Sequence, residues 1–141
     1  DPRMLPVYEE ATRRGLPVLF HTGDSRMDFS SPRRLMKVLE KIPGFTCIAA
    51  HLGGYTEWDT ARRELQGANV YIDTSSSLFL VEPEKALESI RHFGADHTMF
   101  GTDFPMWNPK EELERFFRLG LSEEENRAIL YGNFARLFGL A

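Results

Sequence analysis

Three side chains in this sequence are of types that bind metal ions or transfer protons, and each closes a short apolar run. His21 closes PVLFH, His51 closes TCIAAH and Asp103 closes TMFGTD. Imidazole nitrogens and carboxylate oxygens suit Zn²⁺ and related divalent ions. Such an ion lowers the pKa of bound water from roughly 16 to about 7 and so makes a hydroxide nucleophile. A lone histidine or aspartate after a strand is more often structural, but three at equivalent positions favour a shared site.

The elements that must position these residues alternate between strand and helix patterns. Apolar runs bounded by turn residues predict four strands, over Pro17–His21, Thr46–His51, Val70–Thr74 and Thr98–Asp103. Alternating β and α segments predict a parallel sheet with right-handed crossovers. An open doubly wound sheet and part of a (β/α)8 barrel both fit, and the sequence has no glycine-rich nucleotide motif. In a barrel, the carboxyl ends of the strands meet at the rim where active sites are built.

Helix start signals support the segments between the strands. Ser122 and Glu125 form a capping-box pattern, and Thr56 with Asp59 resembles a second one. Asn133 is placed to cap a short last helix.

Composition excludes several functional classes. The 141 residues fit one domain, and their net charge of −4 without a basic run argues against nucleic-acid binding. No apolar stretch approaches the roughly 18 residues that cross a bilayer, and no signal peptide is visible. The single cysteine, Cys47, lies in an apolar run and is expected in the core of a cytoplasmic protein. The chain opens at Asp1 without an initiator Met, as expected for a fragment.

Five segments occur in an order that resembles a known family. They are HTG, AHLGG, NVYIDTSS, GADHTMFGTDFP and ILYGNFARLFGL. They are similar to the second half of the amidohydrolase-related family that includes aminocarboxymuconate-semialdehyde decarboxylase, resorcylate decarboxylases and related hydrolases. The resemblance implies a (β/α)8 TIM barrel in which His21 is a metal ligand on the fifth strand. It further implies that His51, on the sixth, contacts or activates metal-bound water, and that Asp103, on the eighth, is a ligand that can also take a proton.

By this resemblance, residues 1–141 are the C-terminal half of a metal-dependent hydrolase barrel, with four parallel βα units forming a half-barrel. The His-x-His or Glu-x-His pair of the family's first strand is missing from the sequence. His21 and Asp103 alone should therefore bind a divalent metal weakly. Zn²⁺ is the first choice and Mn²⁺ the second. The isolated chain can be without a bound metal ion.

Several functional readings stay open at this point. The first is a metal-dependent hydrolase that activates a metal-bound water for attack on a lactone, amide or ester-like bond. The second is a non-oxidative decarboxylase of an unsaturated or aromatic carboxylic acid. The third is a catalytically inactive fragment that self-associates, and the fourth is a metal-free binding protein in which the three residues are structural.

Softer expectations concern the substrate and the partners. Loops at the rim contact substrate in the resembling family, so Arg26 could pair with a substrate carboxylate and Trp107 could contact the substrate. Solvated loop residues are the competing interpretation, and Ser75 to Ser77 are expected to be hydrogen-bonding turn residues. A half-barrel leaves two open sheet edges and an exposed apolar inner face. We therefore expect a small-molecule substrate and either a homo-oligomer or pairing with an N-terminal half-barrel.

Overall fold

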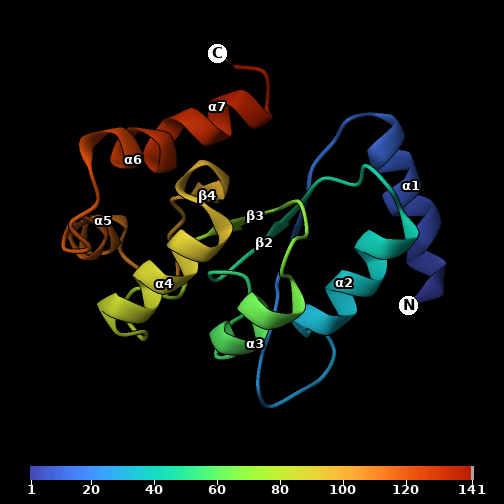
Figure 1. Ribbon diagram of the computed structural model, residues 1–141, viewed down its shortest axis with the longest axis horizontal. Helices are drawn as coiled ribbons and strands as arrows, with labels where there is room; N and C mark the ends of the chain where they lie inside the picture. The colour runs from blue at the N-terminus through green and yellow to red at the C-terminus, as the bar shows by residue number, and fades with distance from the viewer. Residues whose placement is uncertain (141) are drawn as a thin grey trace.

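The computed structural model describes residues 1–140 and shows four strands, each flanked by helices (Figure 1). The strands are β1 (Val18–Phe20), β2 (Cys47–Ala49), β3 (Val70–Asp73) and β4 (Thr98–Met99). The α-helices are α1 (Leu5–Arg13), α2 (Pro32–Lys41), α3 (Trp58–Glu64), α4 (Pro83–Phe93), α5 (Pro109–Phe117), α6 (Glu123–Arg127) and α7 (Asn133–Leu137). Short 3-10 turns cover Pro2–Met4 (η1) and Ala95–His97 (η2), and a π-helical turn covers Ala128–Gly132 (η3). Within these residues, every helix is too short or too polar to cross a bilayer.

The sheet confirms the predicted parallel half-barrel of βα units. Its strand order is β1-β2-β3-β4, so each strand pairs in parallel with its neighbour along the chain. Alternate strand residues share one core cluster with side chains of the helices that follow the strands. Cys47, Ala49, Val70 and Ile72 belong to this core and are at most 1% exposed. Cys47 is therefore a core residue, as expected, and burial raises the pKa of its thiol to about 12.

The opposite face of the sheet would line the interior of a closed barrel. Leu19, Ile48 and Tyr71 form one cross-strand row on this face, since they alternate with the core residues. Leu19, on the edge strand β1, is 60% exposed although it is a large apolar side chain. Ile48 is only 7% exposed and Tyr71 is half-buried, so the uncovered apolar surface on this face is Leu19 beside the open β1 edge.

The strands are shorter than predicted, and the candidate residues lie just beyond them. β1, β2 and β4 end at Phe20, Ala49 and Met99 rather than at the histidines and the aspartate. At two of the three residues the backbone itself is incompatible with a strand. His51 has φ 64° and Asp103 has φ 61°, and this left-handed conformation turns the chain out of the strand.

The predicted caps have mixed outcomes. Ser122 and Glu125 form the capping box at the start of α6, as predicted. Thr56 does not cap α3, whose N-cap residue is Glu57. Asn133 does not cap a separate helix, because α6, η3 and α7 form one continuous helical run. Its side chain is buried and donates instead to the carbonyls of Ala95 and Thr98, at 2.7 and 2.6 Å.

Candidate functional site

The loops after β1 and β2 bring two histidines into contact. His21 Nδ1 lies 2.9 Å from His51 Nε2, and the two rings meet edge to face with centroids 4.8 Å apart. His51 is buried, whereas His21 is exposed at the edge strand. The pair therefore joins an enclosed imidazole to one that is open to solvent.

A close backbone approach holds these two loops together. Gly23 forms a parallel bridge with Tyr55, and Tyr55 N–H donates to the Thr22 carbonyl at 2.6 Å. A Cβ on Gly23 would lie 2.5 Å from the Tyr55 nitrogen, and Gly23 has φ +84°. Only glycine fits there without displacing the backbone. The glycine that follows His21 by two residues is thus what lets the two histidines meet.

The second nitrogen of His51 faces the loop after β3. His51 Nδ1 lies 2.9 Å from the carbonyl oxygen of Ser75 and 3.0 Å from its hydroxyl oxygen. The Ser75 hydroxyl in turn donates to Asp73 Oδ1 at 2.5 Å. The same carboxylate oxygen also accepts the backbone N–H groups of His51 and Ser75, at 3.1 and 3.0 Å. A continuous hydrogen-bonded path therefore runs from Asp73 through Ser75 and His51 to His21.

Asp103 and Trp107 lie on the neighbouring loop and share one partner. Ser76 donates to Asp103 Oδ2 at 2.6 Å and accepts from Trp107 Nε1 at 2.9 Å. The Trp107 ring stacks on Phe79 with centroids 3.8 Å apart. Within residues 1–140, no hydrogen bond joins Asp103 to either histidine. Asp103 therefore bonds to Ser76, whereas His51 contacts the preceding residue, Ser75.

Arg26 is held by a carboxylate of its own loop. Its guanidinium donates to Asp24 at 2.9 and 2.7 Å and is 77% exposed. These hydrogen bonds lower the pKa of Asp24 to about 2, so the pair stays ionised across the physiological range. A substrate carboxylate that binds Arg26 would have to replace or share this partner.

Two residues of the hydrogen-bonded path were missed as site residues in the sequence. Asp73 lay inside a predicted strand, and Ser75 was expected only to stabilise a turn. A signal was present, since Asp73 closes the third apolar run just as the histidines close the first two. Neither of the other two histidines belongs to the site: His92 is exposed, and His97 packs on Tyr71 at the amino-terminal side of the sheet.

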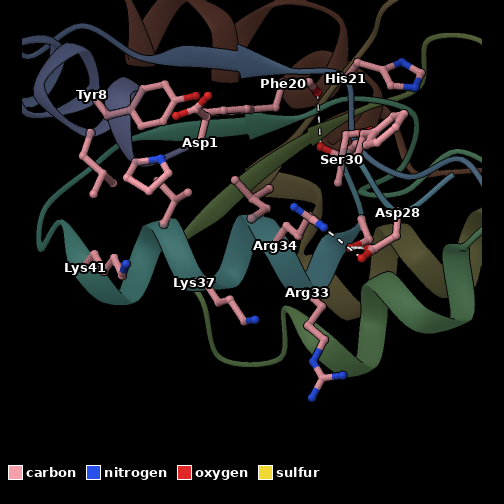
Figure 2. Close-up of a pocket in the computed structure, with 17 residues that line it drawn as sticks. Asp1, Tyr8, Phe20, His21, Asp28, Ser30, Arg33, Arg34, Lys37 and Lys41 are labelled. Carbon is pink, nitrogen blue, oxygen red and sulfur yellow. Dashed lines mark hydrogen bonds and ion pairs between the residues drawn. The ribbon is translucent and has the colours of Figure 1, made fainter.

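A cavity of about 460 Å³ opens beside the edge strand, between α1, the loop after β1 and α2. Tyr8, Phe20 and Phe29 supply aromatic walls, and His21 stands at one end of the hollow (Figure 2). Neither His51 nor Asp103 lines it. The cavity and the hydrogen-bonded path therefore meet only at His21.

The donors at the rim have the right chemistry for a divalent ion but do not form a complete set. Imidazole nitrogen and carboxylate oxygen are common ligands of Zn²⁺ and Mn²⁺. In residues 1–140, however, no three His, Cys, Asp or Glu side chains gather closely enough to hold an ion. What this chain forms by itself is a hydrogen-bonded path of two histidines, Ser75 and Asp73, with Asp103 on the neighbouring loop.

The amino-acid sequence matches a known protein family and a known enzyme. The sequence profile of the family described as Amidohydrolase matches residues 1–140. The γ-resorcylate decarboxylase of Polaromonas sp. (strain JS666) is 25% identical over an alignment of 123 residues, which covers 73% of this chain and 37% of that enzyme.

Two solved structures share the fold over nearly the whole chain. A TIM-barrel protein of Bordetella bronchiseptica superposes with a TM-score of 0.81 at 26% identity, covering 99% of this chain and 51% of that one. A dihydroxybenzoic acid decarboxylase of Polaromonas sp. JS666, solved with manganese and the inhibitor 2-nitroresorcinol, gives 0.75 at 19% identity, with 99% and 55% covered. The chain thus spans about half the length of these structures.

Proposed function

Because this chain belongs to the amidohydrolase family, we propose that residues 1–141 form the C-terminal half of the catalytic rim of a metal-dependent barrel enzyme. The observation that carries this proposal is the 2.9 Å contact between His21 Nδ1 and His51 Nε2 beyond adjacent parallel strands. Active sites of such barrels lie at this end of the strands. A buried imidazole hydrogen-bonded to an exposed one is suited to passing protons between the interior and a bound substrate.

In this proposal His21 and Asp103 are two ligands of a divalent metal ion, with Zn²⁺ the first choice and Mn²⁺ the second. The manganese in the Polaromonas decarboxylase supports a divalent ion. When bound, such an ion supplies Lewis acidity and acidifies a coordinated water. The remaining ligands would come from outside the partial set that this chain presents.

Hydrolysis of a lactone, amide or ester-like bond is the first candidate reaction. His51 Nε2 takes the proton of the attacking water, and the Asp103 carboxylate shuttles this proton to the leaving group by accepting it and then releasing it. Arg26 pairs with a carboxylate of a small-molecule substrate, and the Trp107 ring, fixed by Phe79 and Ser76, forms an apolar wall beside it.

Non-oxidative decarboxylation is the second candidate, and the sequence similarity to γ-resorcylate decarboxylase favours it. Here the carbon–carbon bond to the carboxyl group breaks and CO₂ leaves. The electron pair that stays on the unsaturated or aromatic carbon takes a proton from the protonated Nε2 of His51. His51 therefore acts as a base in the hydrolysis and as an acid in the decarboxylation.

We also propose that the chain associates with a second copy of itself through the open β1 edge. Leu19 and Phe29 near this edge are 60% and 82% exposed, and exposed apolar surface beside an unpaired strand favours pairing with another chain. Association could be the chain's main property if it is inactive by itself. An N-terminal half-barrel would compete for the same edge.

Metal binding tests the central proposal. We expect the purified chain to take up Zn²⁺ or Mn²⁺ weakly, because it offers only a partial ligand set, and His21→Ala or Asp103→Ala to lower the affinity at least about tenfold. Isothermal titration combined with elemental analysis measures this. His92→Ala is the matched control, since His92 is exposed and remote from the rim. Uptake that survives both rim substitutions would refute the metal assignment.

The reaction class requires a separate assay. The chain, alone and together with an N-terminal half-barrel, is offered an aryl lactone and a dihydroxybenzoate in the presence of the metal. Release of acid from the first supports hydrolysis, and release of CO₂ from the second supports decarboxylation. Turnover of neither by a metal-loaded, assembled barrel contradicts both candidates.

A further inference from the structure

His51 has two ring nitrogens, and its surroundings decide which one carries the proton. Nδ1 faces the Ser75 carbonyl oxygen at 2.9 Å, and a carbonyl can only accept a hydrogen bond. Nδ1 also faces the Ser75 hydroxyl oxygen at 3.0 Å. That hydroxyl gives its own proton to Asp73 and thus offers His51 a lone pair. Both contacts therefore require a proton on Nδ1.

We propose that Asp73 and Ser75 are positioning residues that hold neutral His51 as the Nδ1–H tautomer, so that its Nε2 lone pair faces the rim, where it accepts the hydrogen bond of His21 Nδ1–H. This inference rests on the proposed function, in which Nε2 exchanges a proton with water or substrate. Asp73 acts through Ser75, because its carboxylate turns the serine hydroxyl away from His51. Asp73 is 9% exposed and Ser75 6%, so solvent competes little for these bonds.

The tautomer of His51 in turn determines that of His21. With a lone pair on His51 Nε2, the proton in the 2.9 Å contact belongs to His21 Nδ1. His21 Nε2 then keeps its lone pair and is the nitrogen available to bind the proposed metal ion. One carboxylate buried under the sheet rim thereby orients two imidazoles, the base and the candidate ligand.

The backbone reinforces this arrangement. Asp73 Oδ1 also accepts the N–H groups of His51 and Ser75, and it thereby ties the end of β3 to the left-handed turn at His51. The β4 side is equally close, since a Cβ on Gly101 would lie 3.3 Å from Ser75 Cβ and 3.4 Å from Asp73 Cγ.

Nuclear magnetic resonance of the ¹⁵N-histidine-labelled chain tests the inference directly. Long-range ¹H–¹⁵N spectra at about pH 9, where ordinary imidazoles are neutral, distinguish a protonated from an unprotonated ring nitrogen. We expect wild-type His51 as Nδ1–H. Ser75→Ala should shift the ratio of the two tautomers roughly fivefold towards Nε2–H, as for the loss of one neutral hydrogen bond.

Two further variants keep the test decisive. Ser76→Ala is the matched control, because its hydroxyl contacts Asp103 and Trp107 rather than His51, and it should leave the His51 tautomer unchanged. Asp73→Asn weakens the charge-assisted bond to Ser75 and should shift the tautomer ratio in the same direction. It takes the place of Ser75→Ala if that variant does not fold. An Nε2–H wild type, or a Ser75→Ala spectrum like the wild type, overturns the inference.

The readout is independent of turnover and of metal. A chain with the expected tautomers but no metal uptake and no turnover in an assembled barrel would refute the proposed function alone. A chain that binds metal through His21 but shows unchanged tautomers in the Ser75 and Asp73 variants would refute the positioning role alone.

Discussion

At the scale of single residues, Glu112 on α5 is an enclosed carboxylate. Its side chain is 0% exposed, and Oε1 accepts from Arg115 Nη1 at 2.6 Å. Oε2 has no hydrogen-bond partner within the described part of the chain. Burial raises the pKa of Glu112, and the favourable charge of Arg115 offsets this only in part. The folded protein therefore tolerates the neutral form of Glu112 better than the charged one.

This environment predicts a pH-dependent contribution to stability. Because the folded pKa of Glu112 lies above its unfolded value, the folded state binds more protons between the two values, and its stability falls as pH rises through that window. The variant Glu112→Gln should lack this decrease, so its stability relative to wild type should be greater at pH 7 than at pH 4. Urea denaturation of both proteins at the two pH values measures the difference. An identical pH dependence in the exposed-site control Glu114→Gln and in Glu112→Gln would contradict the prediction.

Single-residue patterns in the sequence located only part of the site. His21 and His51 could be predicted to meet because their runs are consecutive and end in the same way. The role of Ser75 could not, because it depends on the geometry of a loop whose hydroxyl direction is set by Asp73. The pairing of Arg26 with Asp24, two residues away, could not be predicted from the position of Arg26 in a loop alone.

At the scale of elements, two similar helix-start patterns had different outcomes. Ser122 accepts from Glu125 N–H at 3.2 Å, and the Glu125 carboxylate accepts from Ser122 N–H at 2.8 Å. Thr56 instead has φ 57°, and its hydroxyl accepts from Ser25 N–H at 3.1 Å. The adjacent loop competes for this side chain, and such tertiary competition is invisible in a local pattern.

Substituting the two residues should reveal this difference. Ser122→Ala removes a true N-cap and should cost about 1 kcal/mol of unfolding free energy. Thr56→Ala removes only exposed loop hydrogen bonds and should cost less than about 0.5 kcal/mol. Chemical denaturation of both variants under one set of conditions measures the ratio. Equal losses would mean that the Ser122 cap contributes no more than a loop contact.

At the scale of the whole molecule, the exposed Leu19 on the inner sheet face provides a test of the proposed self-association through the β1 edge. A charge at Leu19 would disfavour burial of that face in a complex, so Leu19→Lys should lower the fraction of chain found in oligomers. Size-exclusion chromatography with light scattering gives the mass of each species. Leu16→Lys is the matched control, because Leu16 is 53% exposed but precedes the strand. A monomeric wild type at high protein concentration would contradict self-association through this face.

The order of the strands has a consequence for how the chain is made. Since β1, β2, β3 and β4 pair in the order in which they are synthesised, each new βα unit finds its docking surface already in place as it leaves the ribosome. Each strand pairing is closed by a crossover of a single βα unit, because every strand pairs with its neighbour along the chain. The last helical run packs back on β4 and η2, where Asn133 donates to the carbonyls of Ala95 and Thr98. Assembly can therefore advance unit by unit, with the final helix securing the last strand.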